Sequence, residues 1–465
     1  MNWLVLAEAA VVLMAIFLGV RTGGIGLGLW GAAGTFVLIF VFRMDPGKAP
    51  VDAFFIIIAV ITASATMQAA GGIDFLVSVA SRLIRRNPKH ITFVAPLVSF
   101  VFTMGAGTGN IYFALIPVIY ETSYRNGIRP ERPLAASTVT SALGITASPV
   151  SAAMAAYLTL LPGGFGLGKI LSITVPASIV ACLATSFVQQ RIGKELQDDP
   201  EFQRRVASGE IALPVALPVA LVGAGSSGRD GLPAAAVPPV VATTVVMEVP
   251  PGGARSAYIF LAGVVMIVAM GLFSQLRPVV GTGKDAAPLA MTVVIELVMF
   301  TVALLILVVG NVKPAAVLTQ PLLNAGLVAA IALFGIAWMA DTFIAGNQKA
   351  IVEPLGNIVA HYPLFLAVAL FLVAGLTTSQ SATTRTLVPL ALAAAMSPAL
   401  VTAMWPSLIG VWLFPANGSQ IAAVAIDKTG STKLSKIPIC HSFTIPMLVS
   451  WGTVVAAGLL ISLLY

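Results

Sequence analysis

The sequence predicts an all-α polytopic membrane protein built from two inverted-topology repeats, each with a re-entrant hairpin and a broken transmembrane helix. Apolar residues make up 58% of the 465 residues, charged residues make up only 9%, and the mean hydropathy is +0.98. Apolar runs of about 18 to 25 residues, each long enough to cross a hydrocarbon core of roughly 30 Å, recur along the chain. Polar or glycine-rich stretches interrupt the apolar sequence at matching places in the two halves.

The long apolar runs are expected to form simple transmembrane helices, because a soluble chain of this length needs far more charge to cover its surface. The first run has no Lys or Arg before it and no small-residue cleavage site after it, so we expect a retained span and not a signal peptide. The runs cover residues 3–20, 23–42, 51–70, 170–188, 256–275, 289–310, 322–340 and 443–464.

The basic residues set the expected orientation. In a soluble protein the net charge of +7 would suggest a nucleic-acid partner, but here we expect none, because Lys and Arg mark the cytoplasmic loops of a membrane protein. Two basic loops, residues 82–89 and 125–132, are therefore expected in the cytoplasm. Residues 91–104 between them would extend only about 21 Å as a helix, too short to cross alone. Residues 91–124 are thus expected to form a re-entrant hairpin with its tip at "GAGTGN".

Alternating sides along the rest of the chain predict the remaining elements. Residues 133–161 are expected to be a broken helix, with the break at "GITASPVSAA". The apolar stretch 364–396 has "TTSQSATTR" at its centre, so a second hairpin is expected there, entering from the outside. Residues 398–427 are expected to be the second broken helix, with the break at "LFPANGSQIAA". Both termini are then predicted to be periplasmic.

The chain is expected to divide into two transmembrane repeats, residues 1–190 and 255–465, joined by a cytoplasmic linker at residues 191–254. The linker is rich in Pro, Gly and Ala, so we expect it to be poorly ordered, although its apolar part could instead lie along the membrane surface. The hairpins enter from opposite faces, which is typical of the inverted repeats of secondary transporters.

The polar breaks are predicted to form the substrate site, because irregular backbone at bilayer depth is tolerated only where protein or a water-filled cavity satisfies its polar groups. Each break offers residues typical of a helix N-cap. Four helix N-termini would then converge near one depth, where exposed N–H groups attract an anion. A substrate with two carboxylates would match two such clusters, one from each half. The predicted caps are Thr108, Asn110, Ser148 (before Pro149), Thr383, Thr384, Asn417 and Ser419.

Arg385 is the one basic residue that this topology leaves at bilayer depth, where a lone charge normally has a partner. Its partner could be a substrate carboxylate, or Asp341 in a standing ion pair. Asp341 itself could be an interfacial cap, the partner of Arg385, or a proton carrier. Intramembrane Ser and Thr often bond to their own helix, and glycines in spans usually serve close packing. The predicted substrate-binding residues are Thr108, Gly109, Asn110, Thr146, Ser148, Ser381, Thr383, Arg385, Asn417 and Ser419.

Several sequence blocks in both halves resemble the anaerobic four-carbon dicarboxylate (Dcu-type) transporters of bacteria. They are "AIFLGVRTGGIGLG", "MQAAGGIDFLV", "LIRRNPKHIT", "MGAGTGNI", "ITASPVSAA", "AWMADTF" and "SQSATTRTLVPLALA". The resemblance implies exchange of fumarate, malate, aspartate and succinate across the cytoplasmic (inner) membrane during anaerobic respiration. The departures are the linker, which is longer and richer in Pro and Ala than the family pattern, and Arg385, at a position where lysine is common.

The resulting hypothesis is an antiporter that alternates a dianion site between the two faces of the membrane. The alternatives are a cation-coupled symporter of another organic anion, or a dicarboxylate sensor that signals through the linker. A membrane enzyme is not supported, because the sequence has no HExxH motif, no GxSxG motif and no pair of intramembrane aspartates on adjacent spans. No cofactor is expected, the two cysteines give no metal site, and a homodimer is possible.

Overall fold

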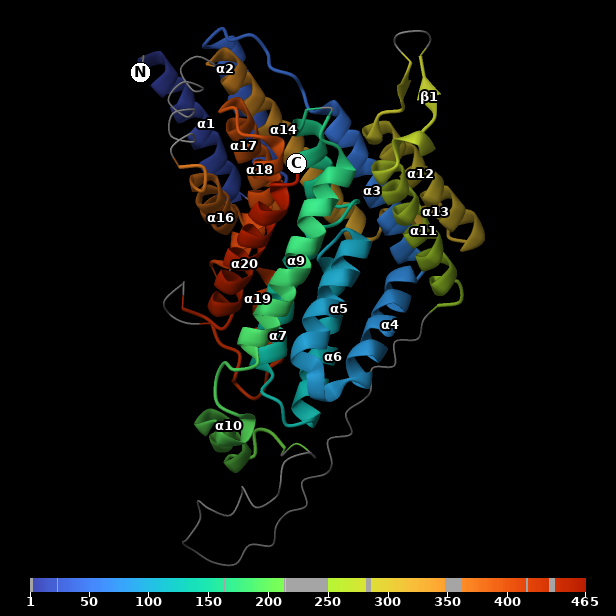
Figure 1. The fold of residues 1–465 in the computed structure, drawn as a ribbon, viewed down its shortest axis with the longest axis vertical. Helices are drawn as coiled ribbons and strands as arrows, with labels where there is room; N and C mark the ends of the chain where they lie inside the picture. The colour runs from blue at the N-terminus through green and yellow to red at the C-terminus, as the bar shows by residue number, and fades with distance from the viewer. Residues whose placement is uncertain are drawn as a thin grey trace, which may run out of the picture.

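The helices of the computed structural model run mostly along one long axis, as Figure 1 shows. The structure describes residues 3–22, 24–162, 164–212, 214, 250–281, 286–347, 362–414, 417–434 and 440–465, and for Val20, Ala53, Asn110, Ala329 and Leu333 the backbone alone. Within these ranges one short antiparallel pair of strands, β1 (Val279–Val280) and β2 (Ala287–Pro288), interrupts an otherwise helical chain. The predicted helical class is therefore confirmed.

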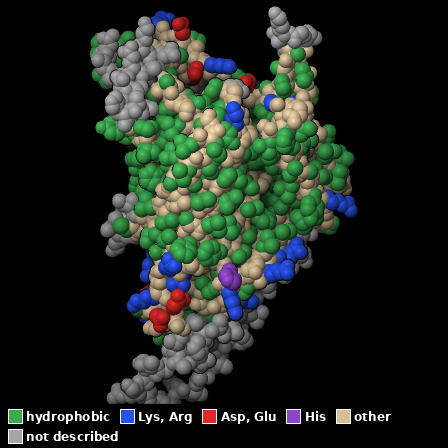
Figure 2. Space-filling model, viewed as in Figure 1, with side chains coloured by type: hydrophobic (Ala, Val, Ile, Leu, Met, Phe, Trp, Pro, Cys, Tyr) green, Lys and Arg blue, Asp and Glu red, His purple; other side chains and the backbone are tan. Residues whose placement is uncertain are grey.

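The described chain contains six helices that are long and apolar enough to cross a membrane, or seven if one bent pair is counted as a single span. The protein is therefore a multi-pass membrane protein. Figure 2 shows the corresponding surface: hydrophobic side chains cover the middle of the visible face, and Lys and Arg gather mainly at its lower end. The six helices are Pro88–Ala106, Leu167–Gln189, Gly253–Leu272, Met291–Val309, Pro321–Gly346 and Thr444–Ser462.

The first half of the chain forms helices α1 to α9. Helices α2 and α14 (Pro321–Gly346) approach so closely that a Cβ atom on Gly28 would lie 2.1 Å from the Ile331 carbonyl oxygen. The glycine-rich stretch after residue 23 thus serves helix packing, as the sequence suggested. The helices are α1 (Trp3–Thr22), α2 (Gly26–Phe40), α3 (Val51–Ala69), α4 (Gly72–Arg86), α5 (Ile91–Ala106), α6 (Asn110–Arg125), α7 (Glu131–Thr146), α8 (Ala152–Leu160) and α9 (Leu167–Gln189), with a 3-10 turn, η1 (Pro88–His90), before α5.

The second half forms helices α11 to α20. It ends with α20, which packs along α9, the last membrane helix of the first half. The helices are α11 (Gly253–Leu272), α12 (Met291–Val309), α13 (Pro314–Leu318), α14, α16 (Phe365–Thr377), α17 (Gln380–Ala393), α18 (Pro398–Met404), α19 (Gly418–Ile426) and α20 (Thr444–Ser462), with 3-10 segments η4 (Ser274–Leu276) and η6 (Trp405–Trp412).

The two halves interlock through helix pairs that cross between them. Helix α2 packs on α14 and α12 packs on α3. Helix α6 packs on α19, and α17 packs on α8. Within each half, α5 packs on α7 and α16 packs on η6. The middle of the molecule is therefore built from short helices of both halves.

The helices of the first predicted hairpin, α5 and α6, contact each other, and their outer ends lie at the lower end of the molecule in Figure 1. The prediction that the first arm is too short to cross is wrong. Helix α5 does not stop at the first glycine but continues to Ala106, and together with η1 it forms a segment of 19 residues that is long and apolar enough to be a span by length and composition. It ends there because Gly107 adopts a left-handed conformation with φ +70°, the usual way to terminate a helix.

Helices α3 and α4 form a bent pair, a broken span or a re-entrant loop, that the sequence analysis missed. They meet at an angle of 75°, at Gly71, which has a φ of +78°. Only glycine adopts this left-handed conformation at little cost. The predicted straight span at residues 51–70 therefore continues, after a bend, to Arg86, and helix α3 ends inside the protein.

The first part of the predicted linker is ordered, contrary to expectation. Residues 191–207 contain a 3-10 turn, η2 (Leu196–Asp198), and helix α10 (Pro200–Ala207), and Phe202 is buried. Arg129, at the start of α7, pairs with Glu131 at 2.7 Å and with Asp199, the N-cap of α10. Specific ion pairs thus order this part of the linker, although its composition predicted poor order. Residues 215–249 of the linker lie outside the described ranges.

The same network reaches the second half of the chain. The Ser431 hydroxyl accepts a hydrogen bond from the Glu131 N–H at 3.1 Å and donates one to Asp427 at 2.7 Å. Burial alone raises the pKa of Asp199, but hydrogen bonds from Arg129 and from backbone N–H groups lower the pKa below its ordinary value. Residues 129–132, 191–199, 427–434 and 440–442 therefore form one cluster, which we call the basal network.

The orientation can be tested by labelling introduced cysteines in a Cys440→Ser background, in which the remaining Cys182 is buried. Asn87→Cys and Asn126→Cys lie exposed beyond the outer ends of α5 and α6, and both are expected to react only from the cytoplasm, because basic loops stay inside. Lys48→Cys, exposed before α3, is the control and should react only from outside. Labelling of Asn87→Cys and Asn126→Cys from opposite sides would exclude the hairpin.

Candidate functional site

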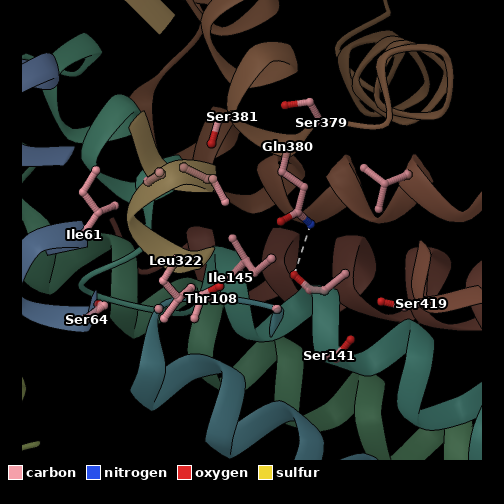
Figure 3. A pocket seen from close by; sticks show the side chains of 18 of the residues that line it. Ile61, Ser64, Thr108, Ser141, Ile145, Leu322, Ser379, Gln380, Ser381 and Ser419 are labelled. Atoms are coloured by element: carbon pink, nitrogen blue, oxygen red, sulfur yellow. Dashed lines mark hydrogen bonds between the residues drawn. The ribbon is translucent and has the colours of Figure 1, made fainter. Parts of the chain in front are cut away.

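A cavity of about 440 Å³ lies where the polar breaks of both halves meet. Residues 107–109 between α5 and α6 and residues 378–381 between α16 and α17 line it. The breaks between α7 and α8 and between η6 and α19 also contribute lining residues, and α3 and α14 complete the wall. Figure 3 shows this cavity, with polar side chains entering from several helices. Segments far apart in the sequence therefore form one site.

Four helices begin at this cavity, as the sequence predicted. The N-cap residues are Gly109 for α6, Ser151 for α8, Ser379 for α17 and Asn417 for α19. Each cap, or a residue beside it, lines the cavity. Because a helix N-terminus carries exposed N–H groups and a partial positive charge, four of them create a site that favours an anion.

The four N-termini differ in how many N–H groups remain for a ligand. The Ser151 hydroxyl accepts a hydrogen bond from the Met154 N–H at 3.0 Å, and the Ser379 hydroxyl accepts one from Ala382 at 3.2 Å. Asn417 forms a reciprocal capping box with Gln420. Gly109 has no side chain to cap α6. No hydrogen bond from an N-cap side chain therefore competes with a carboxylate for the N–H groups in the first turn of α6.

Six of the seven predicted caps do not cap a helix, each for a local reason. The Ser148 hydroxyl accepts from the Val150 N–H at 3.2 Å, which closes a turn, so α8 begins later. The Thr383 hydroxyl donates to the Ser379 carbonyl at 2.9 Å, within its own helix. Thr384 does the same, and α17 begins at Gln380. Helix α6 begins at Asn110 after Gly109, so neither Thr108 nor Asn110 is its cap. Asn417 is a cap as predicted, with Ser419 in the first turn.

The structure brings together part of the predicted substrate set. Thr108, Gly109, Ser381, Asn417 and Ser419 line the cavity. The buried residues Thr146, Ser148, Thr383 and Arg385 do not line it, and the side chain of Asn110 lies outside the described part.

The sequence analysis missed lining residues on the neighbouring helices. Ser64 of α3 was missed because the break after α3 was not recognised, and Ser141 of α7 sits in an uninterrupted helix. Ser379 and Gln380 directly precede the predicted Ser381, so their position in "TTSQSATTR" was a usable signal. Trp412, at the end of η6, also lines the cavity. Nothing in the sequence indicated this except its position just before the break at "LFPANGSQIAA".

The lining of the cavity carries no ionisable side chain among the described residues. Its polar groups are hydroxyls, amides and helix N-termini. The hydroxyls of Ser64, Ser381 and Ser419 make no hydrogen bond within the described chain, so they remain available to a ligand. In the same ranges no group of three or more His, Cys, Asp or Glu residues could hold a metal ion.

Arg385 lies on α17, about one helical turn beyond the cavity-lining residue Ser381. It is 3% exposed, and its Nε and Nη2 atoms have no hydrogen-bond partner in the described structure. Asp341 is exposed and accepts a hydrogen bond from the Lys48 N–H at 2.5 Å. The described residues contain no ion pair between Arg385 and Asp341. In this conformation Asp341 therefore holds the loop before α3.

Comparison with known proteins gives one consistent result. Residues 4–465 match the family described as anaerobic C4-dicarboxylate membrane transporter, DcuA_DcuB. The chain is 35% identical to the anaerobic C4-dicarboxylate transporter DcuB of Escherichia coli O6:H1, over 98% of both chains. It is 36% identical to the C4-dicarboxylate transporter DcuA of Escherichia coli K12, over 95% of both. A crystal structure of the Alcanivorax borkumensis YdaH transporter has a similar fold, with a TM-score of 0.54 and 12% identity over 97% of both chains.

Proposed function

Because the chain belongs to the DcuA_DcuB family of membrane transporters, whose curated members are transporters and not enzymes, we propose that it carries four-carbon dicarboxylates across the cytoplasmic membrane. We propose further that the cavity between the polar breaks is its substrate site. The observation that carries this proposal is the convergence of four helix N-termini on a cavity whose described lining residues include no ionisable side chain.

The chemistry of the cavity suits a small dianion. Helix N-termini and hydroxyls supply donors at several points, so two carboxylates can be held at once. No carboxylate among the described lining residues would repel the substrate. No cationic side chain there would hold it as a tight ion pair, and a transporter must release its substrate as well as bind it.

We propose that residues 1–190 and 255–465 are inverted-topology repeats. The reciprocal contacts support this relation. The pairs α5 with α7 and α6 with α19 correspond to α16 with η6 and α17 with α8. The pair α2 with α14 corresponds in the same way to α12 with α3. Exchanging the two halves leaves this set of contacts unchanged, as a pseudo-two-fold axis requires.

Alternating access would then come from movement of the hairpins and broken helices against the remaining helices. The cavity wall combines both kinds of element, because α3 and α14 face the two hairpin tips across it. A shift of either hairpin would change which side of the cavity is open. We propose exchange of fumarate, malate, aspartate and succinate by this motion, with the basic end of the molecule in the cytoplasm and both termini in the periplasm.

We also propose that Arg385 meets a substrate carboxylate during the transport cycle. A charged side chain at the centre of a membrane helix costs about 2.5–3.5 kcal/mol on insertion scales, so it normally has a partner. Arg385 is buried without a carboxylate partner among the described residues, and it shares α17 with the cavity residues Gln380 and Ser381. A guanidinium can bind a carboxylate through two parallel hydrogen bonds.

Counterflow in proteoliposomes tests the function. Vesicles loaded with succinate are expected to accumulate labelled fumarate, and vesicles without internal dicarboxylate are not, because an antiporter needs a substrate on both sides. Uptake that instead follows an imposed sodium or proton gradient into empty vesicles would favour the symporter, and binding without any flux would favour the sensor.

The site assignment has its own control in the same assay. Gly109→Leu is expected to abolish counterflow, because its side chain enters the cavity at the uncapped end of α6, where only the Ile145 side chain is near the added Cβ. Gly452→Leu makes the same change on α20, where a Cβ meets nothing within 4 Å, and should transport normally. Normal transport by Gly109→Leu would remove the cavity from the path.

Arg385 is tested by paired substitutions. Arg385→Gln is expected to abolish dicarboxylate transport without lowering the melting temperature in detergent, because the charge serves the substrate and not the fold. Arg385→Lys is expected to retain part of the transport activity. If Arg385→Gln unfolds the protein, and Asp341→Asn in the same chain restores both stability and exchange, Arg385 belongs to the scaffold.

A further inference from the structure

Gln380 carries an unused hydrogen-bond acceptor at the cavity. It is the first residue of α17, is 8% exposed, and lines the cavity. Its Nε2 atom donates to the Ala142 carbonyl oxygen of α7 at 3.1 Å, the dashed line in Figure 3. Because a carbonyl oxygen can only accept, this bond fixes which end of the amide faces α7. The Oε1 atom is therefore directed elsewhere, and it has no partner in the described structure.

An amide oxygen buried without a partner is uncommon in proteins, because it loses its hydrogen bond to water and gains nothing in exchange. At a ligand cavity the missing partner can be the ligand. The other polar groups around the cavity are suited to donate: the first turn of α6, and the free hydroxyls of Ser64, Ser381 and Ser419. Gln380 Oε1 is different, because an amide oxygen can only accept.

This acceptor restricts which ligand group can lie beside it. A carboxylate has no proton to donate, and its negative charge is repelled by the amide oxygen. The methylene groups of succinate and the vinyl protons of fumarate are at best weak donors. A hydroxyl or an ammonium group on the second carbon of a dicarboxylate satisfies Gln380 Oε1 with an ordinary hydrogen bond.

Trp412 supplies the complementary donor. Its indole Nε1 is buried and unpaired in the described structure, and the residue lines the same cavity at 4% exposure. The segment that carries it, η6, packs against α17. A 2-substituted dicarboxylate presents both missing partners side by side, a carboxylate oxygen that accepts and a neighbouring group that donates.

We propose that Gln380 sets the substrate preference of the site by accepting a hydrogen bond from the hydroxyl or ammonium group at C2 of the dicarboxylate. The protein then favours 2-hydroxy- and 2-aminodicarboxylates over unsubstituted ones, and Trp412 binds the carboxylate that all of them share. This inference rests on the proposed dicarboxylate site.

Competition with labelled substrate on the unmodified protein is the first test. L-malate and L-aspartate are expected to bind about ten-fold more tightly than succinate, the difference expected for one buried hydrogen bond. 2-Methylsuccinate is the matched control, because its methyl group has nearly the volume of a hydroxyl and donates nothing. It should bind no better than succinate. Binding of 2-methylsuccinate as tight as that of L-malate would overturn the proposal.

Variants provide the second test. Gln380→Met keeps the length of the side chain without the amide, and is expected to weaken the binding of L-malate and L-aspartate about ten-fold more than the binding of succinate. Trp412→Phe should weaken all of these substrates by a similar factor. An equal loss for every substrate in Gln380→Met would overturn the specificity role and leave the transport function intact. Absence of any dicarboxylate binding by the unmodified protein would overturn the proposed function itself. If Gln380→Met does not fold, the ligand series on the unmodified protein decides.

Discussion

The requirement that backbone N–H and C=O groups inside a bilayer find partners governs the centre of this protein. Uninterrupted helices satisfy it internally, whereas every break leaves free groups that need protein or water nearby. The chain gathers the breaks before α6, α8, α17 and α19, two from each half, around one cavity. The groups left free there are mostly donors, because it is the N-termini of α6, α8, α17 and α19 that face the cavity. Preference for an anion is thus a direct result of how the backbone is broken.

Packing between the two halves explains why the centre of the protein remains ordered although its helices are broken there. Each short helix at the cavity lies against a helix of the other half, as α6 does with α19 and α17 with α8. Stacked rings and hydrogen bonds reinforce this contact: Tyr157 of α8 stacks on Trp405 of η6 with ring centroids 4.2 Å apart, and its hydroxyl bonds to Thr402 of α18 at 2.7 Å. The free energy lost at the breaks is therefore offset by contacts between the halves.

Much of this arrangement is predictable from sequence, because bilayer-length apolar runs and polar interruptions are strong signals. The tips around Gly109 and Ser381 and the break at Asn417 were located in this way. Some helices begin at other residues than predicted. This happens where a Ser or Thr side chain makes a different hydrogen bond with nearby backbone, as the Ser148 hydroxyl does. The bend at Gly71 was missed because a Gly pair in an apolar run is equally compatible with a loop. The order of residues 191–207 was unpredictable, since it depends on contacts with the distant residues Arg129 and Lys428. The unpaired Oε1 atom of Gln380 can be recognised only from atomic positions.

The basal network has a consequence for the assembly of the protein. Residues 191–207 continue directly from α9, yet they reach the second half, where Arg205 donates to the Lys428 carbonyl at 2.8 Å. Together with the bond between Ser431 and Glu131, they join the halves at the end where the chain connection between them begins. Covalent continuity between the halves then acts mainly by raising their effective concentration for one another. Two separately synthesised fragments, divided after α10, carry the complementary surfaces that reassembly in a membrane needs.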